Sequence, residues 1–564
     1  MSSAAPSAKT RSTSTTETRS RATKGFVAEE VSAARSRDLV LAITGYLGSG
    51  MTSLAEQLKA RLEKLPEHEG GVSSIKASGL LEAEARKRGE VIPNGSRYER
   101  TQWLQQFGDT LRAEHGTAVV AGLIIREMKA KRRSDANGQA FIIDCCKHPE
   151  EVAVLRDVYG SGFFLIGMIC DLETRKTNLR RKFHGDATEE QIEEIIDTDA
   201  KEEMDWGQHA RKTLPMADYF VSQQEGGALV SIDKQIERLL ELVLGTAVHR
   251  PNRDERGMYA AWGAALRSSC LSRQVGAAII NQQGIVIATG TNDVPAPGGG
   301  IYPSNNSDAR CHLPIEGPPG RDIAIGQKRS IELRVLGSKK TAAGNAPLPF
   351  CRNDFVKEAL WVDVTEKLNK LIDSTSCPPL TKDAVKDALR QTLIRDLVEF
   401  SRALHAEADA LISLARAGGP SCQGASLYVT LFPCHLCTRQ VIAAGIAEVV
   451  YIEPYPKSLA LVLHDDAVRD SEQPANSETS ANAQPNKVVF RLFNGVAPRR
   501  YADLFESHPE QKEATGFMKK NVRRRPLDPL FRKSHIELEK TVAEKFDEVF
   551  GGSNQKAGSA SSKE

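Results

Sequence analysis

The sequence has few cysteines, few aromatic residues and no long apolar run. Ten cysteines among 564 residues are too few for a disulfide framework, so their spacing is better searched for metal ligands. No stretch of 18 or more apolar residues occurs, so the sequence offers no candidate transmembrane helix and we expect no membrane partner. The formal net charge of +2 argues against a surface built wholly for nucleic acid.

The composition is otherwise that of a globular protein, with 40% hydrophobic and 26% charged residues. At about 150 residues per domain, the length allows three to four domains. Segments rich in Ser, Gly and charge predict a disordered arm at 1–37, a flexible loop at 471–486 and a disordered tail at 551–564. The arm lacks a secretory h-region, and we expect a cytoplasmic protein, with an organellar address as the alternative.

The first folded region starts with a strand, a glycine-rich loop and a helix. The apolar run 38–44 predicts a buried strand, and the periodicity of 51–63 predicts a helix. Between them, the loop 45–50 has the context of a phosphate-binding loop, whose backbone N–H groups approach a phosphate. The pattern G-x-x-x-x-G-K-[ST] fails only at Met51, where a lysine would stand.

Two more apolar strands are predicted at 140–144 and 162–170, and a basic helix at 172–182. This order resembles the nucleoside monophosphate kinases of the P-loop class over about 38–245. The resemblance implies a parallel sheet and a nucleotide or phosphate site, with Mg²⁺ as a further candidate, at Gly45, Gly48, Ser49, Gly50, Thr52 and Asp144. Since the lysine is missing, an active kinase, a nucleotide sensor and an inert scaffold all stay open.

The strongest motif in the sequence is an H-x-E followed by a P-C-x-x-C. His405, Cys434 and Cys437 would give one nitrogen and two thiolates to a catalytic Zn²⁺ and leave a position open for water. Glu407 would carry protons between that water, the substrate ring and the leaving amine. With a predicted strand at 426–431 between two helices, the pattern is that of zinc nucleobase deaminases. A structural zinc site would need a fourth ligand, and His435 is sterically poor for that purpose.

The surrounding segments narrow the resemblance. A predicted helix at 258–270 and a strand pair at 274–281 and 285–290 lead into Asn292-Asp-Val-Pro295. This layout resembles the deoxycytidylate deaminases, which implies an α/β/α domain with a mixed sheet. It also implies substrate contacts by Asn292, Arg416 and Tyr455, whereas Asp409 replaces the family's usual asparagine.

The predicted deaminase region, 251–535, is larger than the core of that family. It includes an insert at about 303–395, in which Cys311, Cys351 and Cys377 leave a second zinc site open. A strand is predicted at 487–493, and a basic cluster follows at 519–525.

The whole layout, a P-loop kinase-like half before an enlarged deaminase half, resembles the bacterial antiviral cytosine deaminases (AvcD-like). The resemblance implies hydrolysis of dCMP and/or dCTP to deoxyuridine nucleotides and ammonia, with depletion of dCTP during phage infection. It also implies control by the N-terminal half, with a nucleotide or an inhibitory RNA as regulator. Deaminases of this fold commonly assemble, so we expect a homo-oligomer.

Other functions stay open. A housekeeping dCMP deaminase would supply dUMP but has no need of the first half. A nucleic-acid cytosine deaminase could use the basic cluster to hold a backbone. A nucleotide-binding regulator without activity would not need Glu407.

Overall fold

The computed structural model describes most of residues 36–303, 401–506 and 532–557, with gaps, and scattered positions of 308–388. The predicted loop at 471–486 and the basic cluster at 519–525 lie outside the described residues. Contacts divide the chain into two units. Unit 1 comprises 1–223, 231–249 and 503–564, and unit 2 comprises 224–230 and 250–502.

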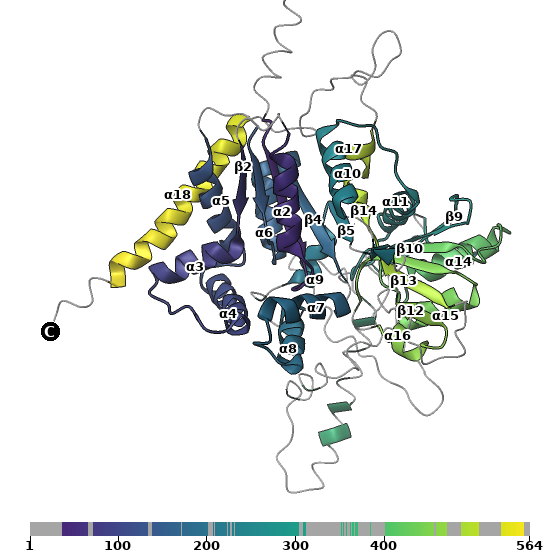
Figure 1. The fold of residues 1–564 in the computed structure, drawn as a ribbon. Coiled ribbons are helices and arrows are strands. Elements are labelled where there is room, and N and C mark those ends of the chain that lie inside the picture. The colour runs from purple at the N-terminus through teal and green to yellow at the C-terminus, as the bar shows by residue number, and fades with distance from the viewer. Residues whose placement is uncertain are drawn as a thin grey trace, which may run out of the picture. The chain divides into compact units, whose positions relative to one another are not determined.

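Unit 1 is built on a parallel sheet (Figure 1). Its strands run in the order β2-β3-β1-β4-β5 and are parallel throughout. They are β1 (Leu39–Gly45), β2 (Val72–Ile75), β3 (Ala140–Ile143), β4 (Phe163–Ile169) and β5 (Tyr219–Ser222). The predicted strands of this unit are confirmed, and β1, β3 and β4 are buried along their whole length because helices cover both faces.

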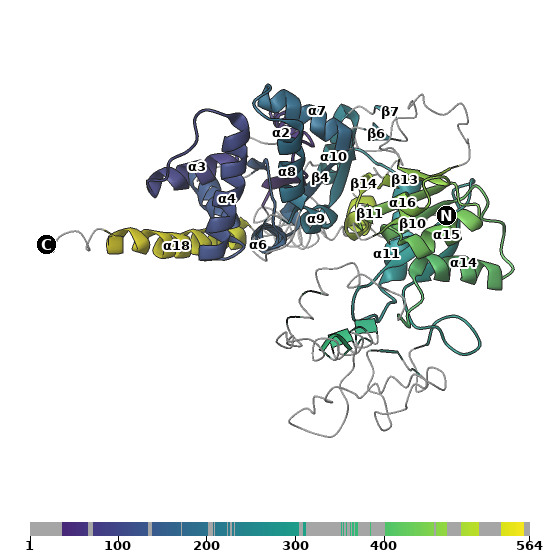
Figure 2. The same cartoon turned by 90° about the horizontal axis from the view of Figure 1, so that it is seen from below.

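Helices lie on both faces of this sheet (Figures 1 and 2). One face carries α2 (Met51–Leu62) and α10 (Ile232–Leu244), and the other carries α5 (Val119–Lys131) and α6 (Pro149–Tyr159). The remaining helices are α3 (Ala77–Lys87), α4 (Arg97–His115), α7 (Leu172–Phe183), α8 (Glu189–Ala200) and α9 (Ala210–Thr213), with 3₁₀ turns at Gly160–Gly162 and Leu214–Met216. The loop 45–50 lies at the end of β1. The strands β3 and β2 lie on one side of β1 and the strands β4 and β5 on the other, so the strand order reverses at β1. Parallel sheets bind ligands at this point.

The last helix, α18 (Arg532–Ala557), packs on α5 and α6 of unit 1. Arg132, at the end of α5, donates from Nε to Glu539 Oε2 at 2.7 Å and also pairs with Asp38. His535 bonds the same Asp38 carboxylate at 3.1 Å. The contacts therefore group this helix with the N-terminal unit, whereas the sequence analysis extended the deaminase region to 535 and began a tail at 551.

Unit 2 contains a mixed sheet in the order β12-β13-β11-β10-β8-β9. Strand β8 runs antiparallel to both of its neighbours, and the other pairs are parallel. The strands are β8 (Gly276–Ile280), β9 (Val286–Thr291), β10 (Ser426–Leu431), β11 (Glu448–Glu453), β12 (Val468–Asp470) and β13 (Val488–Leu492). The predicted mixed α/β fold class is confirmed. Short elements are β6 (Gln224–Glu225), β7 (Ala228–Leu229), β14 (Gly495–Val496), α16 (Ala460–Leu463), a 3₁₀ turn (Pro498–Arg500) and α17 (Tyr501–Phe505).

Two glycines allow helices to lie directly on this sheet. A Cβ on Gly276 would come within 1.9 Å of the Ala261 carbonyl oxygen in α11 (Arg253–Ala265). A Cβ on Gly290 would come within 2.2 Å of the Ala406 oxygen in α14 (Ala406–Arg416). Gly290 pairs with the residue after Gly276, so the two glycines face opposite sides and α11 and α14 cover opposite faces.

Helix α11 differs from the predicted helix at 258–270 at both ends. It begins at Arg253 because Asn252 and Glu255 form a capping box, in which each side chain bonds the other residue's backbone N–H. The helix ends at Ala265, before the polar Ser268 and Ser269 that bond the segment after β9.

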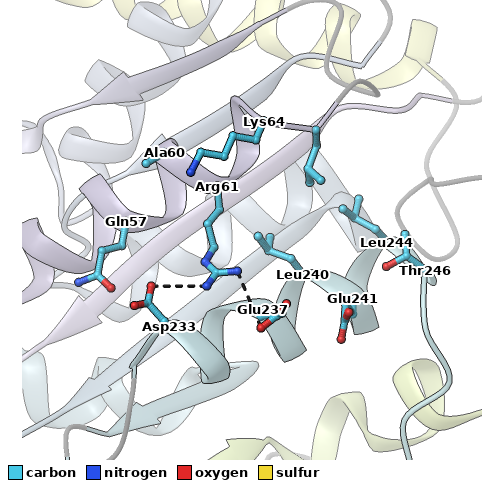
Figure 3. A pocket seen from close by; sticks show the side chains of 11 residues that line it. Gln57, Ala60, Arg61, Lys64, Asp233, Glu237, Leu240, Glu241, Leu244 and Thr246 are labelled. Atoms are coloured by element: carbon cyan, nitrogen blue, oxygen red, sulfur yellow. Dashed lines mark ion pairs between the residues drawn. The ribbon is translucent and has the colours of Figure 1, made fainter.

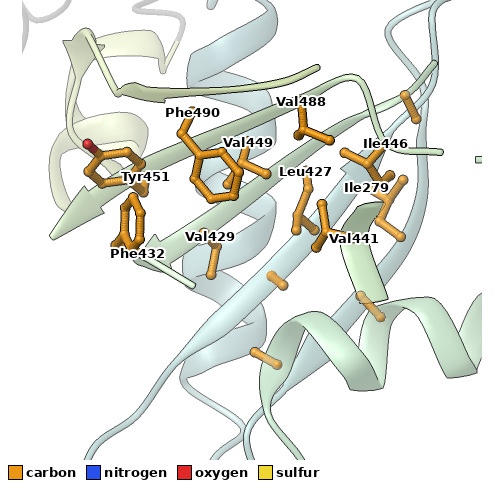
Figure 4. Close-up of a cluster of buried hydrophobic side chains, with 14 of the residues drawn as sticks. Ile279, Leu427, Val429, Phe432, Val441, Ile446, Val449, Tyr451, Val488 and Phe490 are labelled. Atoms are coloured by element: carbon orange, nitrogen blue, oxygen red, sulfur yellow. The ribbon is translucent and has the colours of Figure 1, made fainter. Parts of the chain in front are cut away.

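Alternate residues of the strands form the core beside α14 and α15 (His435–Ala443), as Figure 4 shows. Leu427 and Val429 of β10 and Val449 of β11 are fully buried there. The ring of Phe432 lies edge-on to Tyr451, with centroids 4.8 Å apart, and 5.2 Å from that of Phe490. This packing fixes the end of β10, from which Pro433 and Cys434 follow.

Candidate functional site

Two helix N-termini meet at the predicted metal ligands. His405 is the N-cap of α14 and Cys434 is the N-cap of α15, both with extended backbone and neither side chain used as a cap. Cys437 lies in the first turn of α15. Because the positive ends of helix dipoles favour thiolates, this placement suits two cysteine ligands.

The ligand atoms have the separations of a tetrahedral site. His405 Nδ1 lies 3.4 Å from Cys434 Sγ and 3.3 Å from Cys437 Sγ, and the three ligand atoms fall within 4.8 Å of one another. Zn–S bonds of about 2.3 Å and Zn–N bonds of about 2.05 Å at tetrahedral angles would put N and S about 3.6 Å apart. The geometry and the N, S, S donor set therefore fit a zinc ion. Among the described residues this is the one His/Cys/Asp/Glu group that could hold a metal.

The electrostatics of the group favour a thiolate at Cys434. A hydrogen bond from Cys437, together with the bond and charge of His405, lowers the pKa of Cys434 to about 4 despite burial. The same Cys434 bond raises the pKa of His405 to about 8. Burial raises the pKa of Glu407, which is only 4% exposed. A carboxyl with a raised pKa beside a metal group can both accept and donate a proton near neutral pH.

Several hydrogen bonds hold the helix starts in place. Thr438 Oγ1 donates to the Cys434 carbonyl at 3.0 Å, and Ser458 Oγ donates to the Pro433 carbonyl at 2.7 Å. On α14, Asp409 Oδ2 accepts from the Thr291 N–H at 3.0 Å. Asp409, at a position where we expected asparagine, thus still provides an oxygen that accepts this bond and joins α14 to β9.

A cavity of about 180 Å³ lies next to the metal group, and His405 lines it. The cavity is also lined by Asn292, Asp293 and three cysteines, Cys270, Cys311 and Cys351. The sequence analysis did not identify Asp293, which is 1% exposed.

Asp293 joins three segments of the cavity wall. Its carboxylate accepts from Ser269 and from Arg310 Nη1 at 3.2 Å, and its carbonyl accepts from the Leu404 N–H at 2.9 Å. The only sequence signal was a second polar residue directly after Asn292 at the end of a strand.

The three predicted substrate contacts lie in different places. Asn292 lines the cavity, but its Oδ1 accepts from the Val275 N–H at 2.6 Å and its Nδ2 donates to the Arg273 carbonyl at 2.7 Å. Arg416 ends α14, about 16 Å along the helix from His405, and lies against the glycine turn 298–300. Tyr455 is partly buried and packs on the hydrophobic core of unit 2. The structure brings Asn292, and neither of the other two, to the cavity wall.

The phosphate-loop residues of unit 1 adopt the expected layout. Gly48 and Gly50 have φ values of 84° and 94°, which side chains rarely adopt, and α2 begins directly after them at Met51. Thr52 is exposed in the first turn of α2. Asp144 follows β3 beside β1, accepts from the Ala77 N–H at 2.9 Å, and has a pKa raised by burial.

A larger hollow of about 500 Å³ lies between α2 and α10, away from the loop (Figure 3). Arg61 in its wall faces Asp233 at 3.5 Å and Glu237 at 4.0 Å. The Arg61 guanidinium therefore already has carboxylate partners in the wall of the hollow. Since half-exposed ion pairs of this kind are common on protein surfaces, we assign the hollow no function.

The second zinc site left open in the insert is not assembled in the described residues. Cys311 and Cys351 line the cavity near the metal group without forming a second group of ligand atoms there, and Cys377 lies outside the described residues. No helix among the described residues is both long enough and apolar enough to cross a membrane.

Comparison with known proteins decides the class of unit 2. Residues 251–453 match the family described as the cytidine and deoxycytidylate deaminase zinc-binding region. The matched residues all lie in unit 2. Over 55 residues, the chain is 44% identical to the deoxycytidylate deaminase of Enterobacteria phage T2. The aligned residues make up 10% of this chain and 29% of that relative. The chain thus spans less than a third of the length of this relative.

Two solved structures match parts of this chain at low identity. The dCMP deaminase of cyanophage S-TIM5, solved with dCMP and dUMP, is 17% identical, with a TM-score of 0.20, and the match covers 39% of this chain and 93% of that one. Shikimate kinase from Acinetobacter baumannii is 10% identical, with a TM-score of 0.21, covering 37% of this chain and 96% of that one.

Proposed function

We propose that this protein is a zinc-dependent hydrolase that deaminates deoxycytidine nucleotides, dCMP and/or dCTP, to deoxyuridine nucleotides and ammonia. The observation that supports this most is the tetrahedral spacing of His405, Cys434 and Cys437 beside the buried Glu407. When bound, zinc supplies a Lewis acid that makes a water molecule nucleophilic at neutral pH.

The residues of the chain would divide the remaining work. Glu407, as the carboxylate, would take a proton from the attacking water and pass it to the ring nitrogen and then to the leaving amine, and the pKa raised by burial would help it to hold the proton between these steps. Asn292 would contact the substrate sugar from the cavity wall, using the lone pairs left after its backbone bonds. Arg416 and Tyr455 remain proposed contacts that would require parts of the substrate, or a second subunit, to reach them.

The test is a deamination assay on the purified chain with dCMP, dCTP, CMP, deoxycytidine and a cytosine-containing oligonucleotide. We expect turnover of the deoxynucleotides, no turnover by Glu407→Ala with zinc retained, and loss of zinc from Cys434→Ala. Cys422→Ala is the matched control, because that thiol donates to the Ala444 carbonyl at 3.4 Å and is not among the residues that could hold a metal in the described part of the chain. Unchanged zinc content in Cys434→Ala would refute the ligand assignment, and product from the oligonucleotide alone would favour a nucleic-acid deaminase.

We further propose that the activity depletes dCTP in anti-phage defence, and that unit 1 restrains or triggers it by binding a nucleotide or phosphate at its loop. The joining of a parallel-sheet unit with a phosphate loop to a deaminase domain supports control of this kind, which a housekeeping dCMP deaminase does not need. Nucleotide pools in infected and uninfected cells expressing the wild type or Glu407→Ala would test it. A dCTP loss that is equal with and without phage would favour the housekeeping role.

The assembly and location of the protein belong to the same proposal. We expect a cytoplasmic homo-oligomer, with a nucleotide or an inhibitory RNA as regulator. Light scattering of the purified chain and co-purifying nucleic acid measured by absorbance would test these expectations, and a monomer without nucleic acid would contradict them.

A further inference from the structure

A lysine and a carboxylate from elsewhere in unit 1 meet at the phosphate loop. Lys147, which follows β3, donates from Nζ to the Gly45 carbonyl at 2.9 Å and to Asp199 Oδ1 at 2.7 Å. The other carboxylate oxygen of Asp199 accepts from the Leu47 N–H at 2.6 Å. Asp199 is fully buried and Lys147 is 8% exposed.

The loop itself is held firmly by another helix. Arg175 and Asn178 of α7 donate to the carbonyls of Leu47 and Gly48 at 3.0 and 2.9 Å. These bonds use carbonyl oxygens, so α7 takes up none of the loop's N–H groups, although the Ser49 N–H bonds the Tyr46 carbonyl at 3.1 Å. One of those N–H groups, that of Leu47, is the group that Asp199 contacts.

The loop also contains a polar atom without a partner. The Ser49 side chain is 1% exposed, and its Oγ has no hydrogen-bond partner among the described residues. This hydroxyl lies inside the loop, because a Cβ on Gly45 would come within 2.8 Å of it. A buried hydroxyl without a partner costs stability, which a ligand with acceptor oxygens would recover.

A carboxylate on a loop N–H with an ammonium beside it has the arrangement that a bound phosphate would have. We propose that Asp199 is an internal occupant of the loop, that Lys147 supplies the cation missing at Met51, and that a phosphate group binds by displacing Asp199. The ligand class is a di- or triphosphate, free or carried by a nucleoside. The inference deepens the nucleotide-binding role proposed for unit 1 and does not depend on the deaminase chemistry.

Calorimetric titration of the full chain with inorganic pyrophosphate tests the proposal. Asp199→Asn keeps the shape of the side chain and removes the competing charge, so it should bind pyrophosphate at least tenfold more tightly than the wild type. Lys147→Met should bind at least tenfold more weakly. Lys59→Met on α2 is the matched control, because Lys59 is half-exposed and pairs with Glu63 at 3.7 Å, and it should bind like the wild type.

A further variant and two further ligands sharpen the result. Because Lys147→Met leaves Asp199 as a buried unpaired charge, the double variant Lys147→Met/Asp199→Asn removes both charges and should fold while binding more weakly than Asp199→Asn. ATP binding more tightly than pyrophosphate, with adenosine not binding, would identify a nucleotide, whereas equal binding of ATP and pyrophosphate would identify the phosphates alone.

The proposal is overturned if Asp199→Asn binds pyrophosphate no more tightly than the wild type, or if Lys147→Met binds as well as the wild type. The second result would show that Lys147 does not supply the cation for any binding that occurs. Loss of deamination in the assay above, with these affinities as expected, would leave the loop proposal intact.

Discussion

The carboxylate of Asp409 accepts a hydrogen bond from the backbone N–H of Thr291 at 3.0 Å, which joins the helix carrying Glu407 to the last residue of β9. Both groups are buried, so water cannot replace the bond if it is lost. The next residue after Thr291 is Asn292, on the cavity wall. This bond therefore helps to fix the position of Glu407 relative to the wall of the cavity.

Replacing Asp409 tests this link. Asp409→Asn keeps an oxygen that can accept from Thr291, so we expect zinc content and activity close to the wild type. Asp409→Ala leaves that N–H unsatisfied and should cost about 1–3 kcal/mol of stability in unit 2. Calorimetric melting and zinc analysis would measure both variants. Equal melting of the two variants would show that the bond does not hold α14.

A second prediction concerns Gly290, which lies against the same helix. Because an added Cβ would lie 2.2 Å from the Ala406 oxygen and 2.3 Å from the Ala410 nitrogen, Gly290→Ala must push α14 away from β9. We expect a cost of about 1–3 kcal/mol and a marked loss of kcat, since Glu407 moves with the helix. Gly263→Ala, in α11, where a Cβ would meet nothing within 4 Å, is the control. Wild-type kcat in Gly290→Ala would contradict the prediction.

The sequence was enough to predict the elements whose signal is local. The apolar runs that became β1 and β4, and the H-x-E and C-x-x-C spacings, each depend on neighbouring residues. The strands for which a range was predicted accordingly fall within one or two residues of it, and His405, Cys434 and Cys437 come together in the structure.

Several features that could not be predicted from the sequence depend on distant contacts. Lys147 and Asp199 are 52 residues apart, and Arg132 and Glu539 are 407 apart, without a motif to connect either pair. Nothing in the residues around α18 indicates that it packs on unit 1, because the helices on which it packs, α5 and α6, are distant in the sequence. Asp293 likewise had no signal beyond its place beside Asn292.

The attachment of α18 to unit 1 gives a third prediction. The Arg132 guanidinium pairs with the Glu539 carboxylate, with side chains 8% and 1% exposed. Glu539→Ala leaves the arginine only partly compensated and should destabilise unit 1 by about 3–5 kcal/mol. Glu544→Ala, on the exposed side of the helix and paired at 3.8 Å with Lys540, should change stability by less than about 1 kcal/mol. Hydrogen exchange of the α5 amides would measure both effects, and equal protection in the two variants would refute the role of the pair.

The pH dependence of unit 1 gives a fourth prediction, at Asp109 in α4. Burial raises the pKa of Asp109 to about 6, although the charge of Arg112, 3.2 Å away, opposes the shift. A raised pKa in the folded state means that this carboxyl's contribution to stability is fully present below its unfolded pKa of about 3.9 and is lost as the pH rises through about 6.

Asp109→Asn mimics the protonated carboxyl and should therefore stabilise unit 1 relative to the wild type. The gain should be largest above about pH 6 and should shrink as the pH falls toward 4, where the wild-type carboxyl is itself protonated. Asp233→Asn, at an exposed carboxylate on α10, is the control and should show no such trend. Melting temperatures of the three proteins at pH 4.5, 6 and 7.5 would measure the difference. If Asp109→Asn raises the melting temperature equally at all three values, burial of the charged carboxyl is not the cause, because only a titrating group makes the gain depend on pH.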